Sequence, residues 1–336
     1  MERQEILEHA RQVNAVVGLG GAIEPVEVGP AIARSWNRCA HDFGLDPVKD
    51  EPIVILDNHE LKERQGPLEP LRAIAKGEMA TLYQQLAGSG FSVLLTDREG
   101  VVLDFLGDPT FSKTAAECGM VEGAVWGERH QGTNGMGTCA IEQRPILVHH
   151  NEHFLTRNIG LTCSAAPIFD SEGGLLAVLD ASSFSHMAQQ HTLVLVNMSA
   201  QIIENRAFLC RFRNQYALRF HSRPELIGTL WEGVLALDEE GSILAANRSA
   251  LFQLGYKKPA DMVGLQLRDL FNTGMSALIG HKNLSWLNPV PLYEARQGNR
   301  FFGLMRPPEH QGPSTAAPAR RAAPAITVPG NPKIMR

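Results

Sequence analysis

One short pattern occurs three times in this chain: an apolar run, an acidic turn containing glycine, and a second apolar run. The three copies span residues 91–105, 165–180 and 234–246. In each turn an Asp side chain can accept backbone N–H groups and a Gly can take a positive φ, so each copy predicts a β-hairpin. Stretches with helical spacing separate the hairpins. The predicted fold is therefore α+β, with antiparallel sheets and helices beside them.

Composition and charge are those of a globular protein with room for two domains. The chain has 336 residues, 44% of them hydrophobic and 20% charged, with a formal net charge of −5. A negative balance gives no overall attraction to nucleic acid or to an anionic membrane. The charged N-terminus and the lack of a run of about 18 apolar residues predict a cytoplasmic protein without a membrane span. Five cysteines without a CxxC pair favour free thiols over disulfides.

Three further segments have helical patterns. Residues 28–43 and 68–87 space their apolar side chains as amphipathic helices do, and residues 188–220 are predicted to form one long helix. Along this last segment, apolar or small residues recur at alternating steps of three and four: Leu193, Val196, Ala200, Ile203, Ala207 and Cys210. That spacing is typical of a dimer seam, so we expect a homodimer through residues 188–220. The alternative is an ordinary helix packed on its own sheet.

The remaining segments complete a two-domain plan. Residues 145–149 could form a short strand, and residues 292–295 with 301–305 could close the second sheet. The predicted organisation is an N-terminal extension at 1–27, a sensor domain at 28–187, a connecting helix at 188–222, a smaller α+β domain at 223–306 and a Pro/Ala-rich linker at 307–336.

Residues 119–162 are the least regular part of the first domain and carry its candidate binding groups. Gly132, Gly135 and Gly137 could bring backbone N–H groups to a ligand, with Thr133 and Asn134 adding side-chain hydrogen bonds. The alternative is a tight loop that simply starts a helix. No nucleotide-hydrolysing loop is indicated, since Thr133 and Asn134 follow Gly132 where a Lys and a Ser or Thr would be needed.

The His and Cys residues of this region permit two other interpretations. His149, His150 and His153 with Cys139 and Cys163 offer donors for zinc or iron, although we favour a ligand contact or a structural hydrogen bond for His153 and no metal. Cys139 and Cys163 could instead serve a thiol redox enzyme or a redox or metal sensor. No paired thiols or ordered Cys, His and carboxylate set supports an enzyme.

Several motifs together resemble the sensory half of acetoin- and dihydroxyacetone-type regulators, which are sigma-54-dependent bacterial enhancer-binding proteins. The motifs are Arg34-Ser-Trp-Asn-Arg-Cys39 with Gly44-Leu-Asp-Pro47, Gly127-Glu128, Gly132-Thr-Asn-Gly-Met-Gly-Thr138, Asn151-Glu-His-Phe154, and Cys163-Ser-Ala-Ala-Pro-Ile168 followed by Leu179-Asp180. The resemblance is strong over residues 28–210, as a GAF domain, and weaker over 223–306, as a PAS domain. Such regulators continue into an AAA+ ATPase and a helix-turn-helix domain. Because this chain ends at Arg336, we expect an excised sensory module or a truncated product, with DNA and RNA polymerase contacts only in the missing domains.

The resemblance implies a signal-sensing module that is not an enzyme and has no cofactor. The GAF domain would bind a small acetoin-like carbonyl or hydroxy effector, and the helix and PAS domain would relay its occupancy. The predicted ligand contacts are apolar at Trp126, Phe154 and Leu161 and polar at Glu128, Thr133, Asn134, His153 and Thr162.

Overall fold

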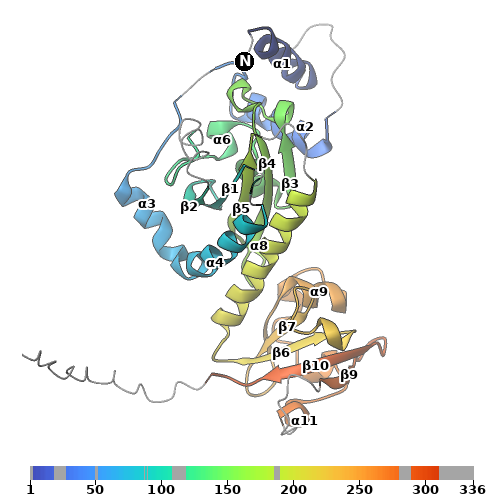
Figure 1. Cartoon of the computed structure of the whole chain (residues 1–336). Coiled ribbons are helices and arrows are strands. Elements are labelled where there is room, and N and C mark those ends of the chain that lie inside the picture. The colour runs from blue at the N-terminus through green and yellow to red at the C-terminus, as the bar shows by residue number, and fades with distance from the viewer. Residues whose placement is uncertain are drawn as a thin grey trace, which may run out of the picture.

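The computed structural model describes residues 3–18, 28–49, 52–86, 88, 90–107, 119–184, 190–279 and 289–309. In these ranges the chain forms two five-stranded antiparallel sheets, and α8 (Gln190–Arg211) runs from one to the other (Figure 1). The predicted α+β class is confirmed.

The first sheet has the strand order β2-β1-β5-β4-β3. Its strands are β1 (Phe91–Asp97), β2 (Val102–Leu106), β3 (Ile146–His149), β4 (Thr162–Phe169) and β5 (Leu175–Ser183). The second sheet has the order β8-β7-β6-β10-β9. Its strands are β6 (Tyr216–His221), β7 (Gly233–Leu237), β8 (Ile243–Ala246), β9 (Val290–Tyr293) and β10 (Arg300–Arg306).

All three predicted hairpins are present, as β1–β2, β4–β5 and β7–β8. Each turn uses its Asp and Gly as expected. The Oδ1 atoms of Asp97, Asp170 and Asp238 accept backbone N–H groups of their own turns, and Gly100, Gly173 and Gly241 have φ values of 84°, 89° and 86°. A side chain at any of these glycines would be strained, which explains why the pattern ends in glycine.

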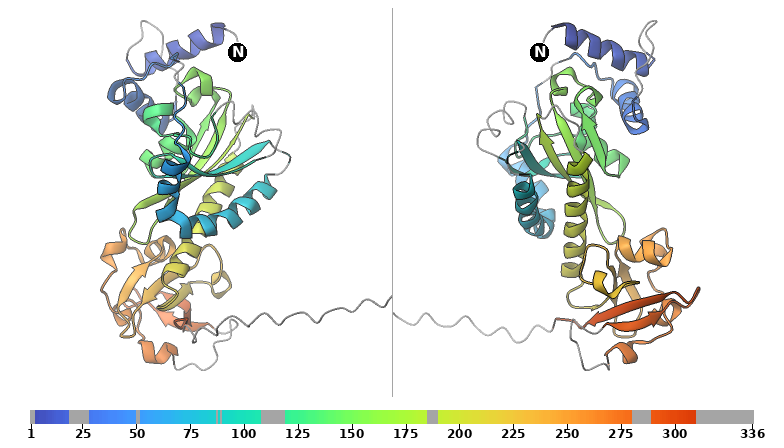
Figure 2. Two further views of the ribbon diagram at one scale, coloured as in Figure 1. Left: turned by 90° about the vertical axis from the view of Figure 1, so that its left-hand side faces the viewer. Right: turned by 45° about the vertical axis from the view of Figure 1, so that its right-hand side comes forward.

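Helices cover both faces of the first sheet. Helices α4 (Glu69–Gln85) and α8 lie side by side against one face, where Leu82 and Ile203 meet Leu179 of β5 (Figure 2). Helix α7 (Gly135–Glu142) packs on the opposite face. Its neighbours there are α2 (Pro30–Asn37), which continues as a π-helix to Asp42, and α6 (Glu128–Gln131).

The remaining helices pack around the two sheets. Helix α1 (Arg3–Val16) belongs to the predicted N-terminal extension, and its Val13 packs into the core on the α7 side of the sheet. Helix α3 (Asn58–Gln65) lies beside the first sheet, and α9 (Arg248–Leu254), α10 (Leu267–Leu270) and α11 (Met275–Ile279) supply Leu251, Leu270 and Leu278 to the core of the second sheet. Asn247 is the N-cap of α9, and its side chain accepts the N–H of Ala250. Most of the predicted linker, residues 310–336, lies outside the described residues. No helix in the described ranges is both long and apolar enough to cross a membrane.

The prediction of one helix over residues 188–220 was wrong at its C-terminal end. Helix α8 stops at Arg211, and β6 begins at Tyr216. Ala217, Leu218 and Phe220 are buried in a strand between β7 and β10, so sheet pairing overrides helical spacing there. The second sheet therefore begins within the segment assigned to the connecting helix.

The middle of the stripe interpreted as a dimer seam is covered by the chain itself, whereas Cys210 at its end is exposed. Val196, Ala200 and Ile203 have no exposed surface and pack with Ala166 and Leu179 of the first sheet. This matches the alternative of a helix packed on its own sheet. The exposed side of α8 carries Val194 instead, with 56% of its surface accessible.

Candidate functional site

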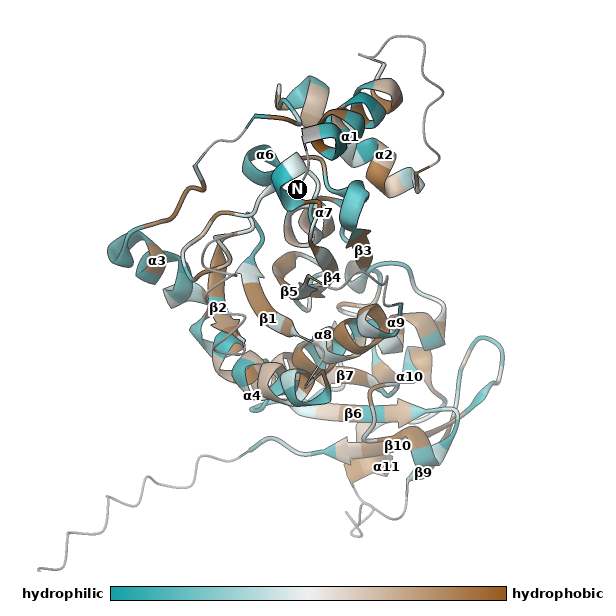
Figure 3. Cartoon of the chain, turned by 45° about the horizontal axis from the view of Figure 1, so that its top comes forward, coloured by the Kyte–Doolittle hydropathy of each residue, from teal (hydrophilic) through white to brown (hydrophobic). Residues whose placement is uncertain are grey.

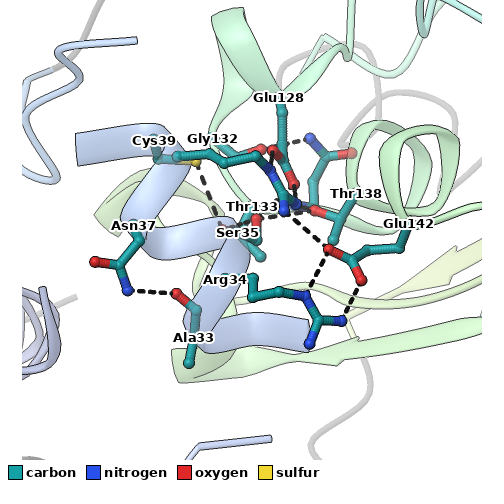
Figure 4. A network of polar contacts seen from close by, with 12 residues as sticks. Ala33, Arg34, Ser35, Asn37, Cys39, Glu128, Gly132, Thr133, Thr138 and Glu142 are labelled. Carbon is teal, nitrogen blue, oxygen red and sulfur yellow. Dashed lines mark hydrogen bonds and ion pairs between the residues drawn. The ribbon is translucent and has the colours of Figure 1, made fainter. Parts of the chain in front are cut away.

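Two arginines fasten helix α2 and its π-helical extension to the glycine-rich segment. Arg38 donates Nε–H to Glu128 Oε2 at 2.9 Å, Nη2–H to Glu128 Oε1 at 3.0 Å and Nη1–H to Glu142 at 2.9 Å. Arg34 reaches the same Glu142 carboxylate (Figure 4). The hydrogen bond from Arg34, supported by Arg38, lowers the pKa of Glu142 below its ordinary value. Glu142 is therefore held as a charged partner of both arginines.

Glu128 is fully occupied by the chain's own donors. It begins α6, which is hydrophilic in Figure 3, yet its side chain has no exposed surface. Besides the two bonds from Arg38, it accepts one from Ser35 Oγ at 2.5 Å. Ser35 Oγ also lies 2.6 Å from Thr133 Oγ1, so Thr133 is engaged as well. A buried carboxylate is tolerated when it is paired in this way, which is a structural use of both residues.

Asn134 is the N-cap of α7. Its Oδ1 accepts the N–H of Gly137 at 2.9 Å. Its Nδ2 donates to the backbone oxygens of Trp126 at 2.9 Å and Gly132 at 2.8 Å. The amide thus uses its acceptor and both donors inside the protein.

The glycines of this loop allow close packing against the chain itself. A Cβ at Gly137 would lie 2.5 Å from the nitrogen of Glu128, and a Cβ at Gly135 would lie 2.5 Å from Asp180 Oδ1. Both contacts are shorter than any side chain tolerates. The loop therefore corresponds to the tight-turn alternative, in which glycine lets α7 approach α6 and β5.

The predicted apolar contacts lie on the α7 side of the sheet. Trp126, Phe154 and Leu161 belong to the same core cluster as Val178 of β5. Trp126 donates its indole N–H to the oxygen of Gly119 at 2.9 Å. The structure thus brings these three together with Thr133 and Asn134 in one layer.

His153 joins that layer as a neutral side chain. It is fully buried, and burial lowers its pKa to about 3. Its Nδ1 lies 3.0 Å from the oxygen of His150, which requires an N–H there, so Nε2 is left to accept the S–H of Cys163 at 3.4 Å. Burial also raises the pKa of the Cys163 thiol well above its ordinary value. The pair is therefore a neutral imidazole and a neutral thiol.

Thr162 does not join the other predicted contacts. Side chains alternate along β4, and Cys163 and Ala165 face the α7 side. Thr162 shares the opposite face with Ala166, towards α4 and α8, and its Oγ1 lies 2.8 Å from Nδ1 of His149.

A polar group that the site prediction left out lies at the centre of the α7-facing side. Asp180 on β5 is fully buried, and its Oδ2 accepts the Ser182 hydroxyl at 2.5 Å, while Oδ1 has no hydrogen-bond partner among the described residues. Ser92 on β1 is opposite Ser182 in the register, and its hydroxyl also has no partner in the described part of the chain. Burial raises the pKa of Asp180 to about 7. The unpaired oxygens of Asp180 and Ser92 thus lie on the same face of the sheet. Ser92 is opposite Ser182, which is two residues from Asp180 along β5.

A sequence signal for this group exists. Residues 175–183 read Leu-Leu-Ala-Val-Leu-Asp-Ala-Ser-Ser, so Asp180 is the one charged residue of a strand buried on both faces. A carboxyl in such a place is expensive unless it has a role.

The thiols are placed for packing. Cys139 and Cys163 are both buried, and burial raises the pKa of the Cys139 thiol well above its ordinary value, with the charge of Asp180 adding to the effect. A thiolate is thus disfavoured at both positions. Within the described residues, no three His, Cys, Asp or Glu side chains gather closely enough to hold a metal ion.

A model of the MimR N-terminal domain matches residues 9–205, more than half of the chain. The chain belongs to the MimR N-terminal domain family. This MimR-type region contains the whole first sheet, Asp180, and the ion pairs of Arg34 and Arg38. The second sheet follows the matched range.

Curated relatives of this MimR-type chain are transcriptional regulators. The acetoin catabolism regulatory protein of Cupriavidus necator is 36% identical over 258 residues, covering 74% of this chain and 38% of the relative. The propane 2-monooxygenase operon transcriptional activator MimR of Mycolicibacterium goodii is 27% identical over 190 residues, covering 55% of this chain and 31% of the relative. The chain thus spans well under half the length of these relatives.

The fold as a whole has a solved counterpart. The crystal structure of the Escherichia coli DhaR(N)–DhaL complex matches with a TM-score of 0.51 at 14% identity, covering 84% of this chain and 100% of that chain. At this identity the match speaks for the fold alone.

Proposed function

We propose that this chain is the sensory region of a transcriptional regulator and that the α7-facing side of its first sheet binds a small neutral hydroxy or carbonyl metabolite. In this proposal residues 28–187 act as a GAF-type domain and residues 223–306 as a PAS-type domain. The naming of the relatives for acetoin catabolism and for a propane 2-monooxygenase operon supports a metabolic signal. Such a module works in the cytoplasm, with DNA and polymerase contacts made by other parts of the regulator.

The observation that carries the proposal is the pair of unpaired oxygens on Asp180 and Ser92. Buried polar groups are nearly always hydrogen-bonded, so each unpaired one requires an explanation. A hydroxyketone offers a carbonyl acceptor and a hydroxyl that both donates and accepts. With its pKa raised to about 7, Asp180 can hold a proton and donate it to the carbonyl, while Ser92 meets the hydroxyl.

The charges around the site favour a neutral ligand over an anion. A carboxylate ligand would lie beside the Asp180 carboxyl. The guanidinium groups of Arg34 and Arg38 are already paired with Glu128 and Glu142. An unpaired buried charge is strongly unfavourable, so discrimination against anions follows from the site itself.

The predicted contacts divide into two groups under this proposal. Trp126, Phe154 and Leu161 supply apolar surface on the correct side of the sheet. Glu128, Thr133, Asn134 and His153 have protein partners, so we assign them to positioning of α7 and β4 and rank Asp180 and Ser92 above them for direct polar contact. Thr162 lies on the face towards α4 and α8, so under this proposal it would not contact the metabolite directly.

Calorimetric titration of the full chain with acetoin and with lactate tests the proposal. Lactate matches acetoin atom for atom except that a carboxylate oxygen replaces one methyl group. We expect saturable binding of acetoin and none of lactate, with acetoin binding weakened in Asp180→Ala, which removes the donor. Equal binding of both compounds, or binding untouched by Asp180→Ala, would contradict the assigned site.

Helix α8 would relay occupancy of the metabolite site to the second sheet. It packs on the first sheet and leads directly into the second, so a shift of β4 or β5 would be passed along it. A homodimer through residues 188–220 would use the exposed side of α8, with Val194 and Met198, since the middle of the predicted seam is covered. The thiol-enzyme alternative predicts consumption of methionine sulfoxide that is lost in Cys139→Ser or Cys163→Ser; burial of both thiols favours the sensor.

A further inference from the structure

A cavity of about 480 Å³ lies between the first sheet and the second. Its walls come from the β4–β5 turn, the C-terminal half of α8, the start of α9 and residues 257–260. The volume falls in the range of roughly 300–1,000 Å³ that is typical of small-molecule sites. The candidate metabolite site around Asp180 contributes no residue to it.

The floor of this cavity is apolar. Phe208 on α8 and Leu251 on α9 line it and are both more than nine-tenths buried, and Leu176 of β5 adds to the same surface. Because these side chains come from both halves of the molecule, an apolar body placed on them would touch both.

Each acidic group in the lining already has a partner. Glu204 accepts two hydrogen bonds from Arg248, both at 2.9 Å, and one from the N–H of Phe169 at 2.8 Å. Asp170 accepts two backbone N–H groups of its own turn. Glu172 pairs with Arg211 at 3.0 Å. Two of the three acidic groups are thus paired with an arginine, and Asp170 is held by backbone N–H donors.

The basic groups are in excess. Four basic side chains and three acidic ones line the cavity, in a chain whose formal charge is −5. Lys257 and Lys258 make no ion pair with any described residue. An anionic group beside these two lysines would therefore meet positive charge that has no ion-pair partner.

We propose that the cavity is a second ligand site, which takes a small organic anion whose apolar body lies on Phe208 and Leu251 and whose carboxylate faces Lys257 and Lys258. A neutral molecule would leave the lysines unused, and a cation would be repelled. The site complements the first one, for which an anion is unsuited.

Occupancy would strengthen the contact between the two sheets. Arg248 of α9 already bridges to Glu204 of α8, and its guanidinium stacks 5.1 Å from the centre of the Phe169 ring. A ligand on the same surfaces adds a second bridge beside this one. It would favour the present arrangement over any other in proportion to its differential affinity.

The test uses naphthoate and its uncharged amide, naphthamide, as a matched pair titrated into the full chain. We expect saturable binding of naphthoate and binding of naphthamide about tenfold weaker, the loss of one charge-assisted contact. Lys257→Met with Lys258→Met should weaken naphthoate to the level of the amide, and Ala207→Phe, which fills the cavity from α8, should abolish binding. Lys62→Met on exposed α3 is the control and should change nothing.

Thermal melting of each variant separates loss of binding from loss of folding, and the lysine variants keep the test valid if Ala207→Phe is unstable. Absence of naphthoate binding would overturn the proposal. So would equal affinity for the amide, or affinity unchanged in the lysine variants.

Discussion

Arg38 and Glu128, which are 90 residues apart in the sequence, form a two-point ion pair whose carboxylate has no exposed surface. This contact joins the first motif of the chain to the glycine-rich segment. It means that residues recognised together as motifs act together in holding α2 and its π-helical extension against α6 and α7.

Removing the arginine from this pair should be severe. Arg38→Met leaves a buried, uncompensated carboxylate at Glu128, and we expect a loss of about 3–5 kcal/mol in the free energy of unfolding. Arg34→Met is the matched control, because Arg34 is 53% exposed, and should lose clearly less than Arg38→Met. Urea denaturation measures both. Similar losses in the two variants would show that the buried pair has no special weight.

Asn134 allows its cap and its donors to be separated. Asn134→Asp keeps the oxygen that accepts from Gly137 but loses the two bonds donated to Trp126 and Gly132. Asn134→Ala loses all three. The second carboxylate oxygen of Asp would lie against the carbonyl oxygens of Trp126 and Gly132 in a buried position, so we expect Asp to be the less stable of the two variants. Asn134→Ala should itself lose about 1 kcal/mol or more, the usual value of an N-cap. Thermal unfolding of both variants checks the order, and an Ala variant as stable as the native chain would refute the capping role.

Asp180 should make stability fall as pH rises. An unfolded Asp titrates near 3.8, whereas burial raises the pKa of Asp180 to about 7 in the folded protein. Between these values the unfolded chain has released a proton that the folded chain keeps, so the contribution of Asp180 becomes less favourable with increasing pH.

The variant Asp180→Asn isolates this effect. The unfolding free energy of the variant minus that of the native chain should increase by about 1.4 kcal/mol per pH unit between pH 3.8 and 7. The buried His153 acts in the opposite direction, losing stability as pH falls below 6.5, but it cancels in the difference. A difference independent of pH would mean that Asp180 titrates normally.

Helix α8 gives opposite expectations for two of its apolar residues. Ile203→Asp places a carboxylate against the sheet and should unfold the first half of the chain instead of merely dissociating a dimer. Val194→Asp, on the exposed side, should leave melting unchanged and lower any self-association. Melting and sedimentation of the two variants decide between the faces. A folded, dissociated Ile203→Asp protein would restore the seam interpretation.

Local chemistry made the hairpins predictable. The Asp and Gly of each turn fix its geometry within a few residues, so Asp97, Asp170 and Asp238 indicate it without tertiary information. The end of α8 was less predictable, because β6 is a strand only through its pairing with β7 and β10. The apolar stripe containing Ile203 has the same spacing whether a second helix or a sheet covers it.

The site was harder to predict than the fold. Glu128, Thr133 and Asn134 are the polar types expected in a binding loop, but their partners lie on α2 or in the loop itself and become visible only in three dimensions. Asp180, in contrast, is visible in the sequence as a lone carboxyl in an apolar strand. Its interpretation as a ligand contact depends on the unpaired Oδ1, which only the structure reveals.

Two serines decide whether the unpaired oxygens on the α7-facing side of the sheet receive a neutral metabolite. Ser92 and Ser164 are both buried, have no hydrogen-bond partner among the described residues, and lie on opposite faces of the first sheet. The decisive measurement is the dissociation constant of acetoin for Ser92→Ala and Ser164→Ala. We predict about five- to tenfold weaker binding in Ser92→Ala and unchanged binding in Ser164→Ala. Equal affinities in the two variants, or weakening only in Ser164→Ala, would contradict the proposed site.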